Sequence, residues 1–328
     1  MKTLQIMDKQ HFVIRDQEIP VPGDHQVLVQ IEIVSTCPRW DMNMWDGKDM
    51  FDYTKTPEYP LLPGFPGHEM AGTVIAAGRG IRQLKVGDRV AAMEHIGGEG
   101  SYCQYLCYRE SDLIKLPDSI SWKQASSFEL LKCVMLGMQQ FGSLQGKTMI
   151  IAGLGPAGIL ALQMARIWGA SRVVGIDVSE ERVGYVKKLG IGEVMLACEL
   201  GDEKFDLGYD CVGAAASVQN IIDHTSKHVV IFGVLKGELR YPEHLWMYGF
   251  KLESYTYRIP NERDRELLID LVANKGLNLE CLQTHHGSFV HYNQAVAWLK
   301  NQEAIKVYFY PAKDFEAAAV DAGAGDMQ

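Results

Sequence analysis

Residues 147–168 read KTMIIAGLGPAGILALQMARIW. An apolar run, Lys147–Ala152, leads into Gly153-Leu-Gly-Pro-Ala-Gly158, and Pro156–Trp168 has the composition of a helix. Glycines spaced as G-x-G-x-x-G permit a tight strand-to-helix turn, in which backbone N–H groups approach a pyrophosphate at the helix N-terminus. The stretch therefore predicts a dinucleotide-binding turn. The alternative is a turn of the same shape that binds another ligand or none.

The chain that follows this turn alternates between short apolar runs and helical patterns. The predicted strands are Arg172–Ile176, Val194–Ala197, Tyr209–Val212 and His228–Val234, and the predicted helices are Ser179–Leu189 and Ala214–His224. This alternation predicts the α/β class, with a doubly wound parallel sheet that is covered on both faces. Between Ala197 and Tyr209 the chain is too short for a crossover helix, so we expect a loop crossover there.

Asp177 ends the second predicted strand, 177 − 158 = 19 residues after Gly158. A carboxylate at this place accepts hydrogen bonds from the adenosine ribose and repels the 2′-phosphate of NADP. Arg182, in the next helix, could stack on adenine, pair with Asp177 or reach a phosphate. We expect NAD rather than NADP as the cofactor. The residues predicted to bind it are Gly153, Gly155, Pro156, Ala157, Gly158, Asp177 and Arg182.

Residues 1–120 are rich in short strand-like runs between Pro and Gly turns, namely Val27–Val34, Met70–Ala77 and Arg89–Met93. The stretch from Pro38 to Pro66 has no clear period and contains several aromatic residues. A loop of that length inside a compact domain is usually functional or disordered, and the aromatic residues argue against disorder. We therefore expect a functional loop here.

Four residues in or just after this region carry metal-binding chemistry: Cys37, His68, Glu69 and Glu129. Thiolate, imidazole and carboxylate together suit Zn²⁺, and catalytic zinc sites keep one position for water or substrate. The spacing alone leaves the question open, because Cys37 precedes His68 by 68 − 37 = 31 residues, which matches no zinc finger. The alternative is that His68 binds no metal and is an ordinary core residue whose ring is hydrogen-bonded.

The composition argues against several classes of protein. The 32 Lys+Arg against 41 Asp+Glu give 32 − 41 = −9, so a nucleic-acid partner is not expected. No apolar run approaches the roughly 20 residues that span a bilayer, and the charged start of the chain does not resemble a signal peptide. The seven cysteines are scattered and odd in number, which favours a reducing cytoplasm over a disulfide framework. A length of 328 residues indicates two domains.

Several segments, in this order, resemble a known superfamily: Gly67-His68-Glu69, Gly72, Val86–Val90, Gly100–Tyr105, Leu116-Pro117-Asp118 and Gly153–Gly158. They are similar to the landmarks of the medium-chain dehydrogenase/reductase superfamily, and Cys37, His68 and Glu69 match the catalytic-metal motif of its zinc-dependent alcohol/polyol branch. Glu129 falls where sorbitol- and glucose-dehydrogenase-like members carry a glutamate that binds the metal directly or through water. Whether Glu69 or Glu129 is the direct ligand stays open.

The resemblance implies a fold and an assembly. It implies a GroES-like β-rich catalytic domain, residues 1–130 with 261–328, and a Rossmann dinucleotide-binding domain, residues 131–260. Relatives of this kind form homodimers or homotetramers, often by pairing edge strands of the Rossmann sheet. The alternating apolar residues of Leu245–Tyr257 are suited to such an edge.

The segment Cys37-Pro-Arg-Trp-Asp41-Met-Asn43 departs from the family pattern, with one residue apparently inserted. Asp41 is expected to take the role of the aspartate that orients a metal ligand. The relay hydroxyl is missing, and Asn43 stands where the relay histidine is expected. Glu69, Glu129, a metal-bound water or Lys132 could replace that proton path. The alternative for Lys132 is an ordinary lysine on a helix surface.

A second departure concerns the structural zinc of many relatives, which four closely spaced cysteines bind. Here only the segment from His95 to Gly100 fills the corresponding gap, and Cys103 and Cys107 have no further pair. One catalytic zinc ion and no structural zinc are therefore expected.

These features lead to three hypotheses. The first is a zinc- and NAD-dependent dehydrogenase acting on a secondary alcohol of a polar, hydroxylated substrate: a polyol, a sugar or an aminocyclitol. Asp46, Asp49 and Asp52 in the aromatic loop favour such a substrate. The second is a zinc-free reductase of activated double bonds or quinones. The third is a non-catalytic nucleotide-binding sensor.

Overall fold

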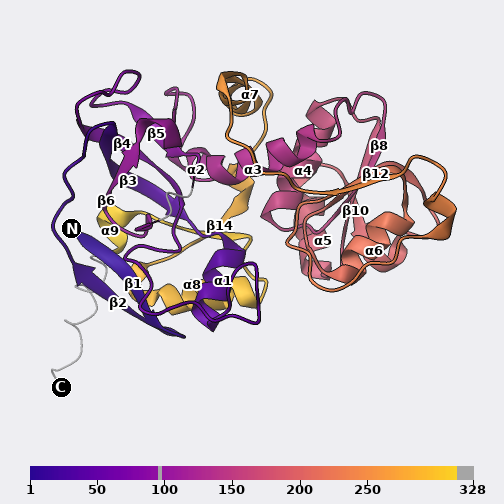
Figure 1. Cartoon of the computed structure of the whole chain (residues 1–328), viewed down its shortest axis with the longest axis horizontal. Coiled ribbons are helices and arrows are strands. Elements are labelled where there is room, and N and C mark those ends of the chain that lie inside the picture. Colours follow the sequence, from indigo (N-terminus) through magenta and orange to yellow (C-terminus); the bar gives the residue numbers. More distant parts are fainter. Residues whose placement is uncertain (95–97, 316–328) are drawn as a thin grey trace. The chain divides into compact units, whose positions relative to one another are not determined.

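The computed structural model describes residues 1–94 and 98–315 of the chain (Figure 1). The chain forms two compact units: Met1–Glu129 together with the chain from Leu282 onward, and Leu130–Cys281. We expected the second unit to end at residue 260, whereas it continues to Cys281. The added segment contains helix α7 (Glu262–Ala273), which Asp264 fastens to Gln139 through a 3.1 Å hydrogen bond.

The second unit contains a six-stranded sheet in which every neighbouring pair of strands is parallel. Its strands are β8 (Thr148–Ala152), β9 (Arg172–Asp177), β10 (Glu193–Leu196), β11 (Phe205–Asp210), β12 (Thr225–Ile231) and β13 (Lys251–Ser254). They are arranged in the order β10-β9-β8-β11-β12-β13, so the direction of the winding reverses between β8 and β11. This is the doubly wound order of dinucleotide-binding domains, and the predicted fold class is confirmed.

Helices connect most of these strands. They are α4 (Pro156–Ile167), α5 (Glu180–Leu189) and α6 (Ala215–Asp223), preceded by α3 (Phe128–Gln139). Two steps have no crossover helix: the step from β12 to β13, and the step from β10 to β11, where one 3-10 turn, η2 (Ala197–Glu199), replaces it. The predicted loop crossover is therefore present. Two further 3-10 turns are η3 (Glu243–Leu245) and η4 (Glu280–Leu282), the latter ending at the boundary of the unit.

The first unit is β-rich, as expected. Its strands are β1 (Lys2–Asp8), β2 (His11–Asp16), β3 (Gln26–Ser35), β4 (Glu69–Ala77), β5 (Arg89–Ala92), β6 (Tyr105–Arg109), β7 (Leu113–Lys115), β14 (Gln283–His286) and β15 (Lys306–Phe309). Strands β1 and β2 form a hairpin, and the remaining strands form one sheet in the order β14-β15-β3-β4-β5-β7, with β6 also paired to β3. The central strand β3 therefore lies between segments from both ends of the chain.

Short helices complete this unit: α1 (Pro38–Asp46), α2 (Trp122–Ala125), α8 (Tyr292–Lys300) and α9 (Pro311–Asp314), with the 3-10 turns η1 (Glu110–Asp112) and η5 (Phe289–His291). Helix α1 lies inside the segment that we expected to be a loop, so that expectation was wrong for its first nine residues. Pro38 begins the helix, and Gly47 ends it in the left-handed conformation (φ 70°). Nine residues span too few turns for a helical period to be recognised from the sequence.

Within the described residues, we find no helix with both the length and the apolar composition needed to cross a membrane.

Candidate functional site

Three strand ends of the first unit bring the candidate metal ligands together. Strand β3 runs antiparallel to both β4 and β15, and Ser35 at its end pairs with Glu69 on one side and Tyr308 on the other. The last residues of β3 therefore lie beside the first residues of β4 and β15. Cys37 follows β3 at the N-cap of α1, and His68 and Glu69 stand at the start of β4.

Among the described residues, Cys37, His68 and Glu69 are the one group of three such side chains positioned for a metal ion. Their candidate ligand atoms all lie within 4.8 Å of one another. His68 and Glu69 are buried, whereas Cys37 is partly exposed.

Glu129 also reaches this group. It lies in the first turn of α3, and its Oε2 is 3.9 Å from His68 Nε2. The preceding turn is anchored to the sheet, because Gln283 Nε2 donates to the hydroxyls of Ser126 and Ser127, at 2.8 and 2.9 Å. The structure thus brings all four predicted ligands into one neighbourhood.

His68 is oriented as metal-binding histidines usually are. Its Nδ1 lies 2.8 Å from the carbonyl oxygen of Pro66, which leaves Nε2 on the side of Glu129. Burial by itself lowers the pKa of His68, but the hydrogen bond to Cys37 and the negative charges of Cys37, Glu129 and Glu69 raise it to about 10. The surroundings of this ring therefore favour a cation.

Glu69 is the least exposed of the four residues, and burial raises its pKa against the opposing charges of Lys306 and His68. Its Oε1 accepts from Lys306 Nζ, whereas its buried Oε2 has no hydrogen-bond partner in the described part of the chain. Leaving a buried carboxylate oxygen unpaired is costly. A soft thiolate, an imidazole and such an oxygen fit a zinc ion.

Lys306 was missed in the sequence. It begins β15 and is completely buried, with its Nζ 2.5 Å from Glu69 Oε1. The available signal was a lysine inside the apolar run Ala304–Tyr310. Because Lys306 lies 237 residues after Glu69, nothing in the local sequence connects the two.

Asp41 is buried, but its hydrogen-bond partners differ from those we expected. Its Oδ1 accepts from the hydroxyls of Tyr102 and Tyr292, at 2.5 and 2.6 Å, and burial raises its pKa. No hydrogen bond joins it to His68 within residues 1–94 and 98–315; instead Trp40 packs edge-on against the His68 ring, with centroids 6.2 Å apart. Asp41 therefore acts on His68 through its charge and not through a hydrogen bond.

Asn43 stands at the position of the missing relay histidine and belongs to a polar cluster at α1. Asn43 Nδ2 donates to the Tyr53 hydroxyl at 3.3 Å, and Arg39 Nη2 donates to the same oxygen at 2.9 Å. The carboxylates expected to bind substrate have other partners. Those of Asp49 and Asp52 accept from backbone N–H groups of their own loop, as in Asx turns.

Asp46, the third of these carboxylates, is the last residue of α1 and accepts a hydrogen bond from Lys300 Nζ at 2.9 Å.

Lys132 belongs to the second unit and is buried, with an exposed fraction of 1%. Its Nζ lies 5.6 Å from the centre of the Tyr257 ring. The alternative of an ordinary surface lysine is therefore wrong.

The glycine-rich turn joins β8 to α4 as predicted. Gly153 has a positive φ of 89°, and a Cβ on Gly158 would lie 1.7 Å from the Gly153 carbonyl oxygen. A Cβ on Gly155 would meet no atom within 4 Å in the described part of the chain, so an approaching ligand has room there. Pro156 and Ala157 form the first turn of α4. This is the geometry of a phosphate-binding turn.

Asp177 fastens the two neighbouring turns to each other. Its Oδ2 accepts from Leu154 N at 2.7 Å, and its Oδ1 accepts from Ser179 N at 2.9 Å. Arg182 is largely buried, which lowers its pKa against the opposing charge of Asp177. Both predicted ribose-binding residues thus lie at the carboxyl end of β9 and the start of α5.

The expectation of no structural zinc concerned a segment of which residues 95–97 lie outside the described residues. Cys103 is buried, and its Sγ contacts the carbonyl oxygens of Gly100 and Tyr105, at 3.4 and 3.2 Å. Burial strongly raises the pKa of this thiol, which disfavours the thiolate that metals require.

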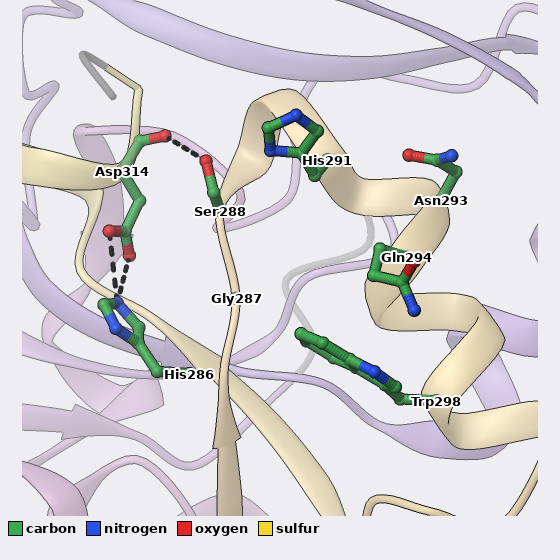
Figure 2. Close-up of a pocket in the computed structure, with 8 residues that line it drawn as sticks. All are labelled: His286, Gly287, Ser288, His291, Asn293, Gln294, Trp298 and Asp314. Atoms are coloured by element: carbon green, nitrogen blue, oxygen red, sulfur yellow. Dashed lines mark hydrogen bonds and ion pairs between the residues drawn. The ribbon is translucent and has the colours of Figure 1, made fainter. Parts of the chain in front are cut away.

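A separate hollow of about 430 Å³ lies in the first unit (Figure 2). His286 Nε2 lies 3.0 Å from Asp314 Oδ2, and Ser288 donates to the Asp314 carbonyl oxygen at 3.1 Å. The other lining residues are Gly287, His291, Asn293, Gln294 and Trp298. None of the predicted site residues lines it.

Comparisons with known proteins agree with this picture. Residues 23–118 match the model of the alcohol dehydrogenase GroES-like domain, and residues 156–274 match that of the zinc-binding dehydrogenases. The chain is 29% identical to the zinc-type alcohol dehydrogenase-like protein YphC of Escherichia coli (strain K12) over 253 residues, 62% of this chain and 68% of YphC. It is 24% identical to a sorbitol dehydrogenase of Halalkalibacterium halodurans over 343 residues, 92% and 96% of the two chains.

Among solved structures, galactitol-1-phosphate dehydrogenase of Escherichia coli shares the fold. It superposes with a TM-score of 0.80 at 22% identity, over 95% of this chain and all of that one.

Proposed function

Because this chain belongs to the zinc-dependent medium-chain dehydrogenase/reductase superfamily, in its alcohol/polyol dehydrogenase branch, we propose that it transfers hydride between a secondary alcohol and NAD. The chain is thus an enzyme, an oxidoreductase. The observation that carries the proposal is the group of partly exposed Cys37 with buried His68 and Glu69, together with the unpaired carboxylate oxygen of Glu69.

We assign the metal to Cys37, His68 and Glu69, with Glu129 as a further ligand, directly or through water. When bound, zinc supplies a Lewis acid that polarises the substrate oxygen and lowers its proton affinity. The Pro66 carbonyl fixes the His68 ring. Asp41, with Tyr102 and Tyr292, holds the start of α1 and so supports Cys37.

A proton must leave the substrate hydroxyl during oxidation, and Asn43 cannot take it up. Of the two carboxylates beside His68, that of Glu69 is fully buried and paired with Lys306, whereas the Glu129 side chain is 12% exposed. Glu129 is therefore better suited to pass a proton to solvent. Lys132 remains a second candidate, since a buried lysine readily changes its protonation state.

We propose NAD as the cofactor, bound by the turn from Gly153 to Gly158 with Asp177 at the ribose. When bound, its nicotinamide ring would supply the hydride acceptor. Two features support this choice: the open space at Gly155, and a carboxylate whose charge repels a 2′-phosphate. Arg182 lies beside that carboxylate and partly compensates its charge.

For the substrate we propose a polar hydroxylated molecule: a polyol, a sugar or an aminocyclitol. The donors of Arg39, Asn43 and Tyr53 support it, since they lie on the same helix and loop as Trp40, which contacts His68. Relatives include proteins named sorbitol dehydrogenase and L-threonine 3-dehydrogenase. We further propose a cytoplasmic location, which suits seven free cysteines, and a homo-oligomeric state.

The test is a screen of polyols, sugars, aminocyclitols and simple alcohols with NAD, together with metal analysis of the purified protein. We expect about one zinc per chain, activity that is lost on chelation, and turnover of polar secondary alcohols. Activity that survives chelation with less than about half an equivalent of zinc would favour the zinc-free reductase. Turnover restricted to apolar primary alcohols would exclude the proposed substrate class.

A further inference from the structure

Lys306 and Glu69 form an ion pair in which both side chains are completely inaccessible to solvent. Removing two charges from water costs several kcal/mol per ion, and a well-packed apolar pair of similar volume is often as stable or more so. Stability alone therefore does not explain why a lysine occupies the start of β15. Its position relative to the metal group offers a better explanation.

Lys306 contacts only one of the two carboxylate oxygens of Glu69. Lys306 Nζ lies 2.5 Å from Oε1, and Oε2 is the atom left without a hydrogen bond among the described residues. The two strands are not neighbours, since β3 lies between β4 and β15. Lys306 and Glu69 therefore meet across the end of β3, where Cys37 follows. The lysine approaches the carboxylate from the side of β15.

Charge balance points the same way. Counting the proposed ligands and Lys306 alone, a thiolate at Cys37 and two carboxylates at Glu69 and Glu129 sum to −3, while a divalent metal and one ammonium group sum to +3. In a buried site such a balance lowers the cost of holding the charges, and Lys306 supplies the third positive charge.

We propose that Lys306 is a positioning residue of the metal centre: by occupying Oε1, it restricts Glu69 to one oxygen, Oε2, toward the metal. This inference rests on the proposed metal site. Catalytic zinc sites have three protein ligands and one water or substrate, and they can expand to five ligands. Without Lys306, both oxygens of Glu69 turn to the metal and the coordination number rises.

Cobalt substitution tests this without relying on activity, because the visible bands of Co²⁺ are intense for four ligands and weaker, at shorter wavelength, for five. The protein is depleted of metal and loaded with Co²⁺ in the wild type and in Lys306→Met, Lys306→Gln and Lys115→Met. The last is a matched control, since Lys115 Nζ pairs with Asp88 Oδ1 at 2.8 Å in the same sheet. Circular dichroism checks the fold of each variant.

We expect the four-coordinate spectrum for the wild type and for Lys115→Met, and a weaker band at shorter wavelength for Lys306→Met. Lys306→Gln should give a spectrum between those of the wild type and Lys306→Met, because its shorter, uncharged side chain donates to Oε1 more weakly. A wild-type protein that takes up no Co²⁺ contradicts the metal site itself, and with it the proposed function. Uptake with the same spectrum in Lys306→Met overturns only the role of Lys306.

Folding failure is also informative. Bound Co²⁺ neutralises Glu69, so a lysine that acts on the metal geometry is dispensable for folding in the loaded protein. If neither Lys306 variant folds with Co²⁺ present, Lys306 serves the fold and the proposal is wrong.

Discussion

Asp177 is a single residue whose charge distinguishes the two nicotinamide cofactors. We predict that the wild type has a higher kcat/KM with NAD than with NADP, because like charges brought together in a binding site cost several kcal/mol. Asp177→Ser should narrow this gap by about tenfold or more, mainly through better use of NADP, since each 1.4 kcal/mol is a factor of ten. Steady-state kinetics with both cofactors measures it.

Asp177 also accepts hydrogen bonds from Leu154 N and Ser179 N, so the variant loses some local order. Glu181→Ser is a suitable control, as Glu181 lies in the same turn and its carboxylate bonds to the Ser179 hydroxyl. A wild type that uses NADP as well as NAD contradicts the assignment.

At the scale of the residue, the sequence predicts which side chains can bind a metal. It does not predict which distant residues those side chains contact. Cys37, His68 and Glu69 are recognisable because thiol, imidazole and carboxylate types are rare together and follow a family pattern. Tyr292 is 251 residues from Asp41 in sequence, and Lys306 is 237 from Glu69. Those contacts depend on the pairing of β15 with β3, which no local pattern encodes. The hydrogen-bond partners of Asp41 could not be predicted for that reason.

The turn between β8 and α4 allows a prediction at the scale of an element. Gly158→Ala should destabilise the second unit, since its Cβ would overlap the Gly153 carbonyl oxygen, 1.7 Å away. Gly155→Ala should fold normally, since its φ is −76° and its Cβ meets no atom of the described residues. It should nevertheless weaken NAD binding, because the methyl group fills the space of the pyrophosphate.

Thermal unfolding and NAD titration of both variants separate the two effects. Unchanged NAD affinity in Gly155→Ala would show that the dinucleotide does not approach this glycine.

Helix α7 supplies a prediction of pH dependence. The hydrogen bond from Arg258 is the main cause that lowers the pKa of Asp264 from 3.8 to about 2, against the opposing effect of burial. A carboxyl group whose pKa is lower in the folded state stabilises the fold above its unfolded pKa. That contribution is lost as the pH falls from about 4 to about 2. Asp264→Asn should therefore cost about 1–2 kcal/mol at pH 7 and progressively less below pH 4.

Urea denaturation of wild type and variant between pH 7 and pH 2.5 measures this difference. Asp118→Asn serves as a control, since that side chain is fully exposed. A destabilisation by Asp264→Asn that stays constant down to pH 2.5 would assign the effect to packing instead of charge.

Helices and strands were predictable from the sequence where the pattern of apolar residues extends over enough positions. The strands and helices from β8 to β12 follow from apolar runs and helical patterns bounded by glycines. Helix α1 could not be predicted, because it is short and its buried residues, Asp41, Met44 and Trp45, include a charged one. Asp41 can be buried because its carboxylate accepts hydrogen bonds from Tyr102 and from Tyr292, the first residue of α8.

At the scale of the whole molecule, one edge of the second unit is exposed in a way that a monomer seldom tolerates. Strand β13 pairs with β12 on one side and with no strand of the described residues on the other. Just before it, Trp246, Met247 and Tyr248 are 79%, 87% and 79% exposed. An unpaired strand edge beside large apolar side chains favours association with another chain.

We therefore predict a homodimer, or a homotetramer built from it, that associates through β13 and the preceding segment. Replacing Trp246 and Met247 by lysine should raise the dissociation constant by at least about 30-fold, because large apolar residues at the centre of an interface contribute about 2 kcal/mol or more. Val21→Lys is the matched control, since Val21 is 88% exposed in the first unit. Sedimentation velocity over a range of concentrations measures the association. A wild type that sediments as a monomer at every concentration would exclude the dimer, and a dimer insensitive to the double substitution would place its interface elsewhere.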